Sequence, residues 1–386
     1  MRTQVGIVGA GPAGLTLALL LQREGIDCVV LEARNREYVE KRVRAGLLEQ
    51  NTVNLLRDLG VAERLDREGL EHAGVYLRHN GRNHYVDMAA LTGRHITIYG
   101  QQEVVKDLIA ALLDRGGDVR FDVSDVKLHE IEADAPRVTF THEGAEDELS
   151  CDAIAGCDGF HGVCREAISE HVTEYEFVYQ FGWLGILAEA QPATNELIYA
   201  WHERGFALYT MRSQKISRLY LQVPIDEDIE NWPDDRIWDE LRIRLGDVNA
   251  GTIFEKGITP MRSLVTEPMQ RGRLFLAGDS AHIVPPTGAK GLNLAVNDVR
   301  LLAPALARLV REGSTTGLDG YSGAALSRVW RAQDFSNYMT QMLHDLGGGP
   351  FERKLQLARL EYIERSEAAA RSLAENYVGL PAAPDF

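Results

Sequence analysis

The chain has 386 residues and a formal net charge of −16, with 45% hydrophobic and 25% charged residues. These proportions are ordinary for a globular protein and exclude a disordered or collagen-like chain. A strongly acidic protein repels phosphate backbones, so nucleic-acid binding is not expected as its main activity. The length suits two or three domains.

The cysteines and the apolar segments indicate where the protein works. Cys28, Cys151, Cys157 and Cys164 do not have the paired spacing of a zinc site, so we expect no metal and free thiols in a reducing compartment. No apolar run reaches the ~18 residues of a membrane span, and no secretory signal opens the chain. These features predict a soluble, cytoplasmic protein.

Residues 4–31 have the pattern of a βαβ unit, with a glycine-rich turn between the first strand and the helix. In this G-x-G-x-x-G motif, Gly9 permits the turn, Gly11 lets the backbone approach a pyrophosphate, and Gly14 lets helix and strand pack closely. Glu32 ends the second strand, where it is placed to accept hydrogen bonds from ribose hydroxyls. The context predicts dinucleotide binding, with a merely structural turn as the alternative.

The remaining elements follow in a recognisable order. Hydrophobic spacing predicts helices over 52–59 and 103–113, and a hairpin over 75–86 around Asn80-Gly81. Short strands are expected at 119–123, 137–142, 153–157 and 274–277, an aromatic-rich sheet over 174–224, and mostly helix over 297–376. The sequence therefore predicts an α/β fold in which a Rossmann-like unit precedes an inserted, mainly β domain and C-terminal helices.

A second motif favours FAD over NAD as the bound dinucleotide. Asp279 follows a strand and can hold a ribityl hydroxyl, and a helix beginning near Gly291 can direct N–H groups at a flavin. Residues 157–165 form a third element of this kind. The chain has one G-x-G-x-x-G motif only, so a single dinucleotide fold is expected.

Together these motifs resemble the class A flavoprotein aromatic monooxygenases. Longer strings spread over the whole chain resemble the branch of that family that hydroxylates 4-hydroxybenzoate: Arg42-Val-Arg-Ala-Gly-Leu-Leu-Glu-Gln50, Cys157-Asp-Gly-Phe-His-Gly162, Phe181-Gly-Trp-Leu-Gly185, Asp279-Ser-Ala-His-Ile-Val-Pro-Pro-Thr-Gly-Ala-Lys-Gly-Leu-Asn293 and Glu375-Asn-Tyr-Val-Gly-Leu-Pro381.

The resemblance implies an enzyme that converts 4-hydroxybenzoate to 3,4-dihydroxybenzoate with NAD(P)H and O₂, through a flavin C4a-hydroperoxide. It also implies non-covalent FAD and a homodimer. We expect a discontinuous FAD-binding domain over 1–175 and 260–300, a substrate-binding sheet domain over 176–259, and a C-terminal helical region over 301–386.

Matching the family's motifs position by position implies the site residues. Those for FAD are Gly9, Gly11, Ala13, Gly14, Glu32, Arg42, Arg44, Gln101, Asp279, Leu292 and Asn293, with Arg218 placed to influence the position of the flavin. Those for the aromatic acid are Tyr199, Thr210, Arg212, Tyr220 and Pro286. The catalytic group comprises Pro286 and a proton relay of Tyr199, Tyr377 and, at its solvent end, His72.

These roles make chemical sense. A benzoate carboxylate in an aromatic pocket must be paired, and Arg212 can bind it with both arms of its guanidinium. Ionising a phenol near pH 7 shifts its pKa by about three units, or roughly 4 kcal/mol, which a relay would assist. The plainer alternatives are a surface arginine, packed tyrosines with satisfied hydroxyls, and an ordinary exposed histidine at position 72.

Some positions depart from the family pattern. Ala13 stands where many members have serine, and Thr210 replaces the more usual serine. Trp201 is bulkier than expected, which together with Thr210 leaves the volume of the pocket open, and residues 244–252 form a shortened segment.

Three rival functions remain: the same chemistry on another benzoate, a flavin reductase or oxidase without hydroxylation, and a nucleotide-sensing module.

A basic cluster indicates the reductant. Five cations gather around Tyr38 within eleven residues, namely Arg34, Arg36, Lys41, Arg42 and Arg44. A 2′-phosphate adds about two negative charges for such arginines to bind, so we expect NADPH to be preferred over NADH. The alternative is a solvated helix face whose charge is balanced by Glu37 and Glu40.

Overall fold

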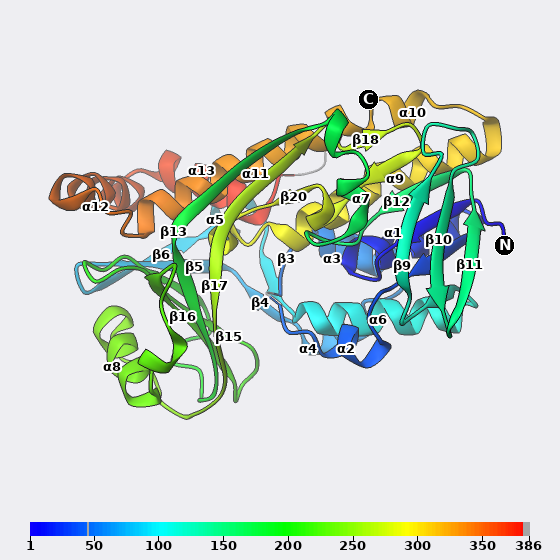
Figure 1. Cartoon of the computed structure of the whole chain (residues 1–386). Coiled ribbons are helices and arrows are strands. Elements are labelled where there is room, and N and C mark those ends of the chain that lie inside the picture. The colour runs from blue at the N-terminus through cyan, green and yellow to red at the C-terminus, as the bar shows by residue number, and fades with distance from the viewer. Residues whose placement is uncertain (45, 381–386) are drawn as a thin grey trace.

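The computed structural model describes residues 1–44 and 46–380. Ala45 and Pro381, which belong to two of the motif strings above, lie outside this described part, as do residues 382–386. Two long neighbouring strands run from an α/β body to a second, mainly β body, and long helices lie along one side of both (Figure 1). The predicted α/β class is confirmed.

The first body is built on a six-stranded sheet whose central strands are parallel. Its order is β18 (Gln270–Arg271), β19 (Leu274–Leu276), β12 (Ala153–Gly156), β1 (Val5–Val8), β2 (Cys28–Leu31) and β8 (Asp118–Arg120). The central strands are buried because helices cover the sheet. These helices are α1 (Pro12–Arg23), α6 (Gln101–Asp114) and α9 (Gly291–Glu312), and α1 contacts both of the others.

The second body is an eight-stranded sheet, antiparallel except for one pair. Its order is β20 (His282–Ile283), β17 (Thr252–Glu267), β13 (Thr173–Glu189), β16 (Ser217–Pro224), β15 (Ala207–Met211), β14 (Leu197–Ala200), β5 (Gly74–His79) and β6 (Arg82–Asp87). Strands β14 and β5 form the parallel pair, with Leu197 opposite Val75. Asn80 and Gly81 both have positive φ, the backbone that a tight β5–β6 hairpin requires.

Two small sheets and several helices complete the described part. One sheet contains β9 (Ser124–His129), β10 (Arg137–His142) and β11 (Ala145–Ser150), and the other contains β3 (Leu47–Glu49), β7 (Ile96–Ile98) and β4 (Leu70–His72). The shorter helices are α2 (Arg36–Lys41), α3 (Gln50–Asp58), α4 (Glu63–Glu68), α5 (Met88–Thr92), α7 (Val163–Glu166), α8 (Asp234–Leu245) and α10 (Thr316–Asp319). The C-terminal helices are α11 (Tyr321–Leu343), α12 (Gly349–Arg365) and α13 (Glu367–Val378).

The expected domain limits differ from the observed elements in three places. Strands β5 and β6, which fall in the expected first domain, extend the sheet of the second body because β5 pairs with β14. The limit at residue 300 falls inside α9, and the limits near 175 and 260 fall inside β13 and β17. The division of the chain into functional domains stays a prediction. Strands β13 and β17 and helix α9 each continue across an expected limit, so each belongs to the parts on both sides of that limit.

The longest elements that were not predicted are α8 and β17. Helix α8 buries Ile237, Trp238 and Leu241 against the second body, a helical spacing that the sequence does contain. Strand β17 includes Gly257 and Pro260, which argue locally against a strand. Pro260 is accommodated because the β13–β17 register shifts between Val178 and Gly182. Across the described residues, no helix combines the length and the apolar character needed to cross a membrane.

Candidate active site

The glycine-rich turn has the shape that a pyrophosphate needs. A Cβ on Gly9, whose φ is +105°, would lie 2.3 Å from the carbonyl oxygen of Cys157, and one on Gly14 would lie 2.0 Å from that of Gly9. A Cβ on Gly11 would meet nothing within 4 Å, and no side chain caps the start of α1. Gly9 and Gly14 are therefore needed for packing, whereas Gly11 leaves free N–H groups facing open space.

Glu32 connects the second strand to this turn. Its carboxylate accepts hydrogen bonds from the backbone N–H groups of Ala10 (2.7 Å) and Arg34 (2.9 Å). A carboxylate has about four acceptor positions, so two remain for ribose hydroxyls. Ala13 is buried and adds no hydroxyl to the turn.

Charged residues from separate segments converge beside the turn. Burial and the neighbouring Arg42 lower the pKa of Arg44, whereas Asp279 raises it. Asp279 lies in a one-turn 3₁₀ helix after β19 with its side chain exposed. The surrounding protein still desolvates this carboxyl and raises its pKa, against the opposing influence of His282 and the two arginines. Gln101, the half-buried first residue of α6, is the remaining side chain of the predicted FAD set.

The side chain of Asn293, at the start of α9, forms all of its hydrogen bonds within the protein. Its side-chain oxygen accepts from Glu49 N (2.9 Å) and Thr52 Oγ1 (2.7 Å), and its side-chain nitrogen donates to the Leu47 (3.0 Å) and Ala289 (3.1 Å) carbonyls. The amide side chain is fully used in holding α9 to β3 and α3. Leu292 and Asn293 can therefore serve a flavin only through backbone N–H groups, which no side chain caps.

The residues predicted to bind the aromatic acid line one cavity. Tyr199, Thr210, Arg212, Tyr220 and Pro286 lie around it together with Arg218. The other lining residues come from both bodies and were not predicted: Gly46, Leu47, Ile98, Trp183, Leu197, Leu208 and Ala289. The cavity is thus formed where the eight-stranded sheet meets the β3–β7 sheet and the turn before α9.

Trp201 does not narrow this cavity. Its indole N–H donates to Gln356 Oε1 in α12 (2.6 Å), and the residue is absent from the cavity wall. The end of β14 directs Trp201 toward the C-terminal helices, whereas Tyr199 faces the cavity. The expectation that Trp201 affects the pocket volume is therefore wrong, and Thr210 is the remaining departure that lines it.

Arg212 is a half-buried cation at one end of the cavity. It donates to the carbonyl oxygen of Arg44, as does Arg218 Nη1 (2.9 Å). Within residues 1–44 and 46–380, no carboxylate lies within ion-pair distance of Arg212. Burial and the neighbouring Arg218 lower the pKa of Arg212 to about 10. A carboxylate ligand would supply the missing counter-charge.

Tyr199 lines the cavity, and its hydroxyl contacts that of Tyr377, which lies outside the cavity wall. Their hydroxyl oxygens are 2.5 Å apart, and the two residues are 1% and 0% exposed. Burial raises the pKa of both hydroxyls, so both stay protonated in the neutral range. The pair can pass a proton by exchanging donor and acceptor roles without bulk water.

His72 lies elsewhere than expected. It ends β4 with a side chain that is 1% exposed, and its Nδ1 lies 3.0 Å from Glu196 Oε2. The expectation of a histidine at the solvent is therefore wrong, because the imidazole is buried although β4 is an edge strand of the small sheet. In the described part of the chain, no hydrogen bond joins His72 to Tyr377.

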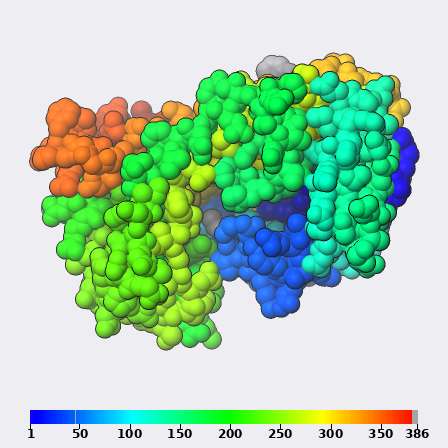
Figure 2. Space-filling view, in the orientation of Figure 1, coloured from blue at the N-terminus to red at the C-terminus, as the bar shows by residue number. Residues whose placement is uncertain are grey.

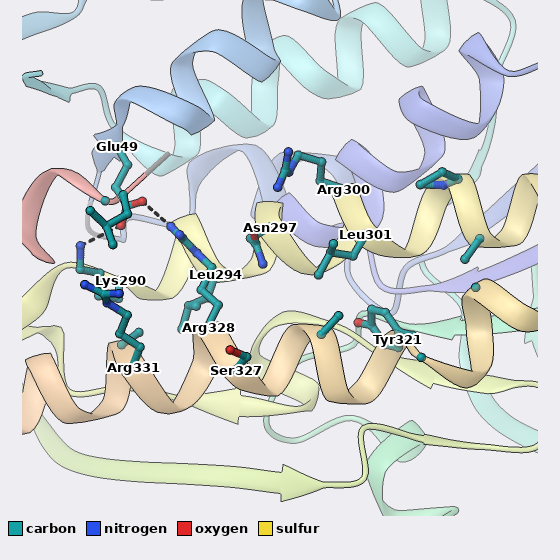
Figure 3. A pocket seen from close by; sticks show the side chains of 18 of the residues that line it. Glu49, Lys290, Leu294, Asn297, Arg300, Leu301, Tyr321, Ser327, Arg328 and Arg331 are labelled. Carbon is teal, nitrogen blue, oxygen red and sulfur yellow. Dashed lines mark hydrogen bonds and ion pairs between the residues drawn. The ribbon is translucent and has the colours of Figure 1, made fainter. Parts of the chain in front are cut away.

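A buried charge network that was not predicted lies directly behind Tyr377. Lys290 Nζ donates to Glu49 Oε1 (2.7 Å) and to the carbonyl oxygen of Tyr377 (2.9 Å), and Arg328 binds the other oxygen of Glu49 (2.5 Å). Although burial opposes it, these two cations hold the pKa of Glu49 below its usual range. Figure 3 shows the network at one end of a groove of about 1080 Å³ between α9 and α11. Glu49 and Lys290 both belong to the motif strings that carry the family resemblance, and this membership was the only indication of the network in the sequence.

The geometry suits FAD: an uncapped glycine turn, an acid at the end of β2, and an uncapped α9 start beside an aromatic cavity. Figure 2 shows a hollow between the blue surface around α2 and the green surface above it. The fold and the site together define a flavoprotein monooxygenase. Residues 2–336 match a family model described as FAD binding domain, and the chain belongs to this family.

Comparisons with known proteins agree over nearly the whole chain. It is 49% identical to the p-hydroxybenzoate hydroxylase of Acinetobacter baylyi, over 99% of this chain and 96% of that protein. It is 22% identical to a putative FAD-dependent monooxygenase, YetM, of Bacillus subtilis, over 86% and 91%. The crystal structure of p-nitrophenol 4-monooxygenase from Pseudomonas putida DLL-E4 has the same fold, with a TM-score of 0.85 at 20% identity over 99% and 100%.

Two glycine substitutions should separate packing from cofactor binding. Gly14→Ala forces a Cβ against the Gly9 carbonyl oxygen, so the apoprotein should lose about 1–3 kcal/mol of stability. Gly11→Ala meets no protein atom, so the apoprotein should keep its melting temperature but bind FAD at least tenfold more weakly. Thermal melts and flavin-fluorescence titrations measure both. Unchanged FAD affinity in Gly11→Ala would place the pyrophosphate elsewhere.

Proposed function

We propose that this flavoprotein monooxygenase hydroxylates 4-hydroxybenzoate at the 3-position, giving 3,4-dihydroxybenzoate with NAD(P)H and O₂. The observation that carries the proposal is one cavity lined both by Arg212, which has no acid partner among the described residues, and by Tyr199, whose hydroxyl contacts that of the buried Tyr377. These two groups suit the carboxylate and the phenol of a para-substituted ring. The 49% identical relative, a p-hydroxybenzoate hydroxylase, supports the same substrate.

FAD would be held without a covalent bond by the turn at Gly9–Gly14, Glu32, Arg44, Gln101 and Asp279, with the flavin against the start of α9. When bound, it accepts hydride from the reductant and activates O₂ for transfer of one oxygen atom to the ring. Arg218, which donates to the Arg44 carbonyl (2.9 Å), would restrain the segment that borders the flavin.

The substrate-binding residues orient the ring. The Arg212 guanidinium would leave the Arg44 carbonyl to bind the carboxylate through two N–H groups, with the Thr210 and Tyr220 hydroxyls donating to the remaining oxygen positions. The backbone of Pro286 would border the ring at its reacting edge. Because Trp183, Leu197 and Leu208 form apolar walls, the ring would be shielded from bulk water.

The tyrosine pair activates the ring. A phenolate is more electron-rich than a phenol, and Tyr199 Oη would accept the substrate's phenolic proton while passing its own to Tyr377. Holding the phenol ionised near pH 7 requires roughly 4 kcal/mol, which hydrogen bonds to the phenolate would help to provide. The proton would then continue toward His72.

Removing either tyrosine hydroxyl should uncouple the reaction. Tyr199→Phe and Tyr377→Phe lose one oxygen each, so folding and FAD binding should stay near normal. Flavin reduction should continue while product formed per NAD(P)H falls well below one and peroxide rises. Tyr209→Phe is a matched control, because its buried hydroxyl bonds Ala193 N (2.8 Å) outside the cavity. A ratio near one in both relay variants would contradict the assignment.

Arg212→Lys should weaken substrate binding because lysine keeps the charge but loses the planar fork. Affinity for 4-hydroxybenzoate should fall at least tenfold, about 1.4 kcal/mol, in titrations of the oxidised enzyme. The uncharged analogue 4-hydroxybenzamide is the control, and its weaker binding should change little between the two enzymes. Equal losses for both ligands would show that Arg212 does not bind the carboxylate.

We propose further that NADPH is the preferred reductant. Arg34 and Arg42 lie over the exposed ring of Tyr38, at 5.3 and 6.0 Å, and are free of acid partners among the described residues. The two cations within α2 are already paired in the helix, Arg36 with Glu40 and Lys41 with Glu37. The arginines around Tyr38, together with Arg44, would therefore bind the 2′-phosphate.

Kinetics at two salt concentrations test this preference. At low salt the KM for NADPH should be lower than that for NADH, and salt should raise the KM for NADPH more strongly because it screens exposed charges. Arg42→Gln should reduce the difference between the KM values for NADPH and NADH. Arg36→Gln, which removes a paired cation, should leave this difference unchanged. A lower, salt-insensitive KM for NADH would overturn the preference.

We also propose a homodimer in the cytoplasm. Large apolar side chains are exposed along the outer side of the C-terminal helices and the neighbouring end of β13: Tyr175, Phe177, Trp330, Tyr338, Phe351, Leu355 and Tyr362. Exposed aromatic groups of this kind are typical of subunit contacts. All four cysteines are free and three are buried, which suits a reducing compartment.

A further inference from the structure

The surroundings of His72 raise a question that the two tyrosines leave open. If the phenolic proton reaches His72, the imidazole cannot release it directly to water, because its side chain is 1% exposed. The Glu196 side chain, with Oε2 3.0 Å from His72 Nδ1, is 17% exposed. The carboxylate therefore lies between the buried ring and the solvent.

Strand pairing fixes this arrangement. Leu197 opposes Val75 in the parallel β14–β5 pair, so Glu196 lies beside the turn that joins His72 to β5. The backbone N–H of Ala73 and the hydroxyl of Tyr85 both donate to Glu196 Oε1 at 3.3 Å. In the described part of the chain, neither Glu196 Oε2 nor His72 Nδ1 has a hydrogen-bond partner, and the two atoms lie 3.0 Å apart. One carboxylate oxygen is thus anchored, and the other faces the imidazole.

Other ionisable groups near His72 are unsuited to take its proton. Glu71 precedes it in β4, but adjacent strand residues point to opposite faces, and Glu71 pairs with His95 at 2.9 Å. Burial and Glu196 raise the pKa of Tyr85, so this hydroxyl stays protonated. Glu196 is the carboxylate available to His72.

We propose that Glu196 is a positioning residue for His72 and the exit for the relay's proton. The N–H bond at Nδ1 of the imidazolium breaks as an O–H bond forms at Glu196 Oε2, and the carboxyl then loses this proton to water. Oxidation states do not change, and charge moves from the imidazolium to the solvent. The inference rests on the proposed function, because the proton originates on the phenol of the substrate.

The test uses the holoenzyme and stopped-flow absorbance of the phenolate of bound 4-hydroxybenzoate. Glu196→Gln keeps an acceptor for Ala73 and Tyr85 but cannot take a proton, so phenol ionisation should slow at least tenfold. Because Glu196 does not line the cavity, the dissociation constants of FAD and 4-hydroxybenzoate should stay within twofold. Glu196→Asp, which retains a carboxyl group, should recover part of the rate.

Glu71→Gln is the matched control, since it removes the same charge one residue from His72 and should leave the rate unchanged. Ionisation at the original rate in Glu196→Gln would overturn the proposed exit. Tyr377→Phe separates the two ideas. If it slows ionisation while Glu196→Gln does not, only the exit is wrong, and if neither variant slows ionisation, the relay itself is wrong. If Glu196→Gln does not fold, Glu196→Ala takes its place, because it also lacks a carboxyl group: a rate equal to that of the unmodified enzyme would then overturn the exit.

Discussion

The hydrogen-bonded ladder between β13 and β17 is the interaction on which the rest of the molecule depends. These strands have 17 and 16 residues, so at about 3.4 Å per residue each spans roughly 50 Å. Thr173 pairs with Glu267 at one end of the ladder, and Glu189 pairs with Thr252 at the other. The ladder thereby carries the second sheet away from the nucleotide-binding body (Figure 1). A single ladder of this length holds the substrate cavity at a fixed place beside the turn before α9.

The charged and polar groups of the site are complementary to the substrate carboxylate and the flavin that it would bind. The cavity offers Arg212 without an acid partner in the described structure, and the uncapped start of α9 offers backbone N–H groups. Behind them, the buried Glu49 carboxylate is compensated by Lys290 and Arg328. Lys290 also holds the Tyr377 carbonyl, which links the start of α9 to the helix that carries the relay hydroxyl.

Hydroxylation needs a dry site and yet must export a proton, and the structure meets both demands with side chains. Tyr199 and Tyr377 are almost completely buried, which excludes water but leaves a 2.5 Å contact for proton transfer. Burial of His72 extends the same design, because an exposed imidazole would admit solvent to the small sheet. The proposed release at Glu196 places the first contact with water on a carboxylate at the start of β14.

The sequence by itself determined the local features that depend on few neighbouring residues. The turn at Gly9–Gly14, the hairpin at Asn80-Gly81 and the start of α9 at Gly291 follow from backbone rules that act over a few residues, and the structure has all three. The resemblance also named six of the residues that line the cavity: Tyr199, Thr210, Arg212, Arg218, Tyr220 and Pro286.

Only the tertiary structure decided which segments become neighbours. Local patterning cannot choose a strand's partner, so the joining of β5 to β14, and with it the burial of His72 beside Glu196, could not be predicted. Strand β17 could not be predicted across Pro260, because a proline disfavours a strand unless tertiary pairing provides an edge or an irregular register, as the shift in β13 does here. Side-chain direction was equally out of reach: Trp201 and Tyr199 lie two residues apart, yet the end of β14 sends the tryptophan to α12 and the tyrosine to the cavity.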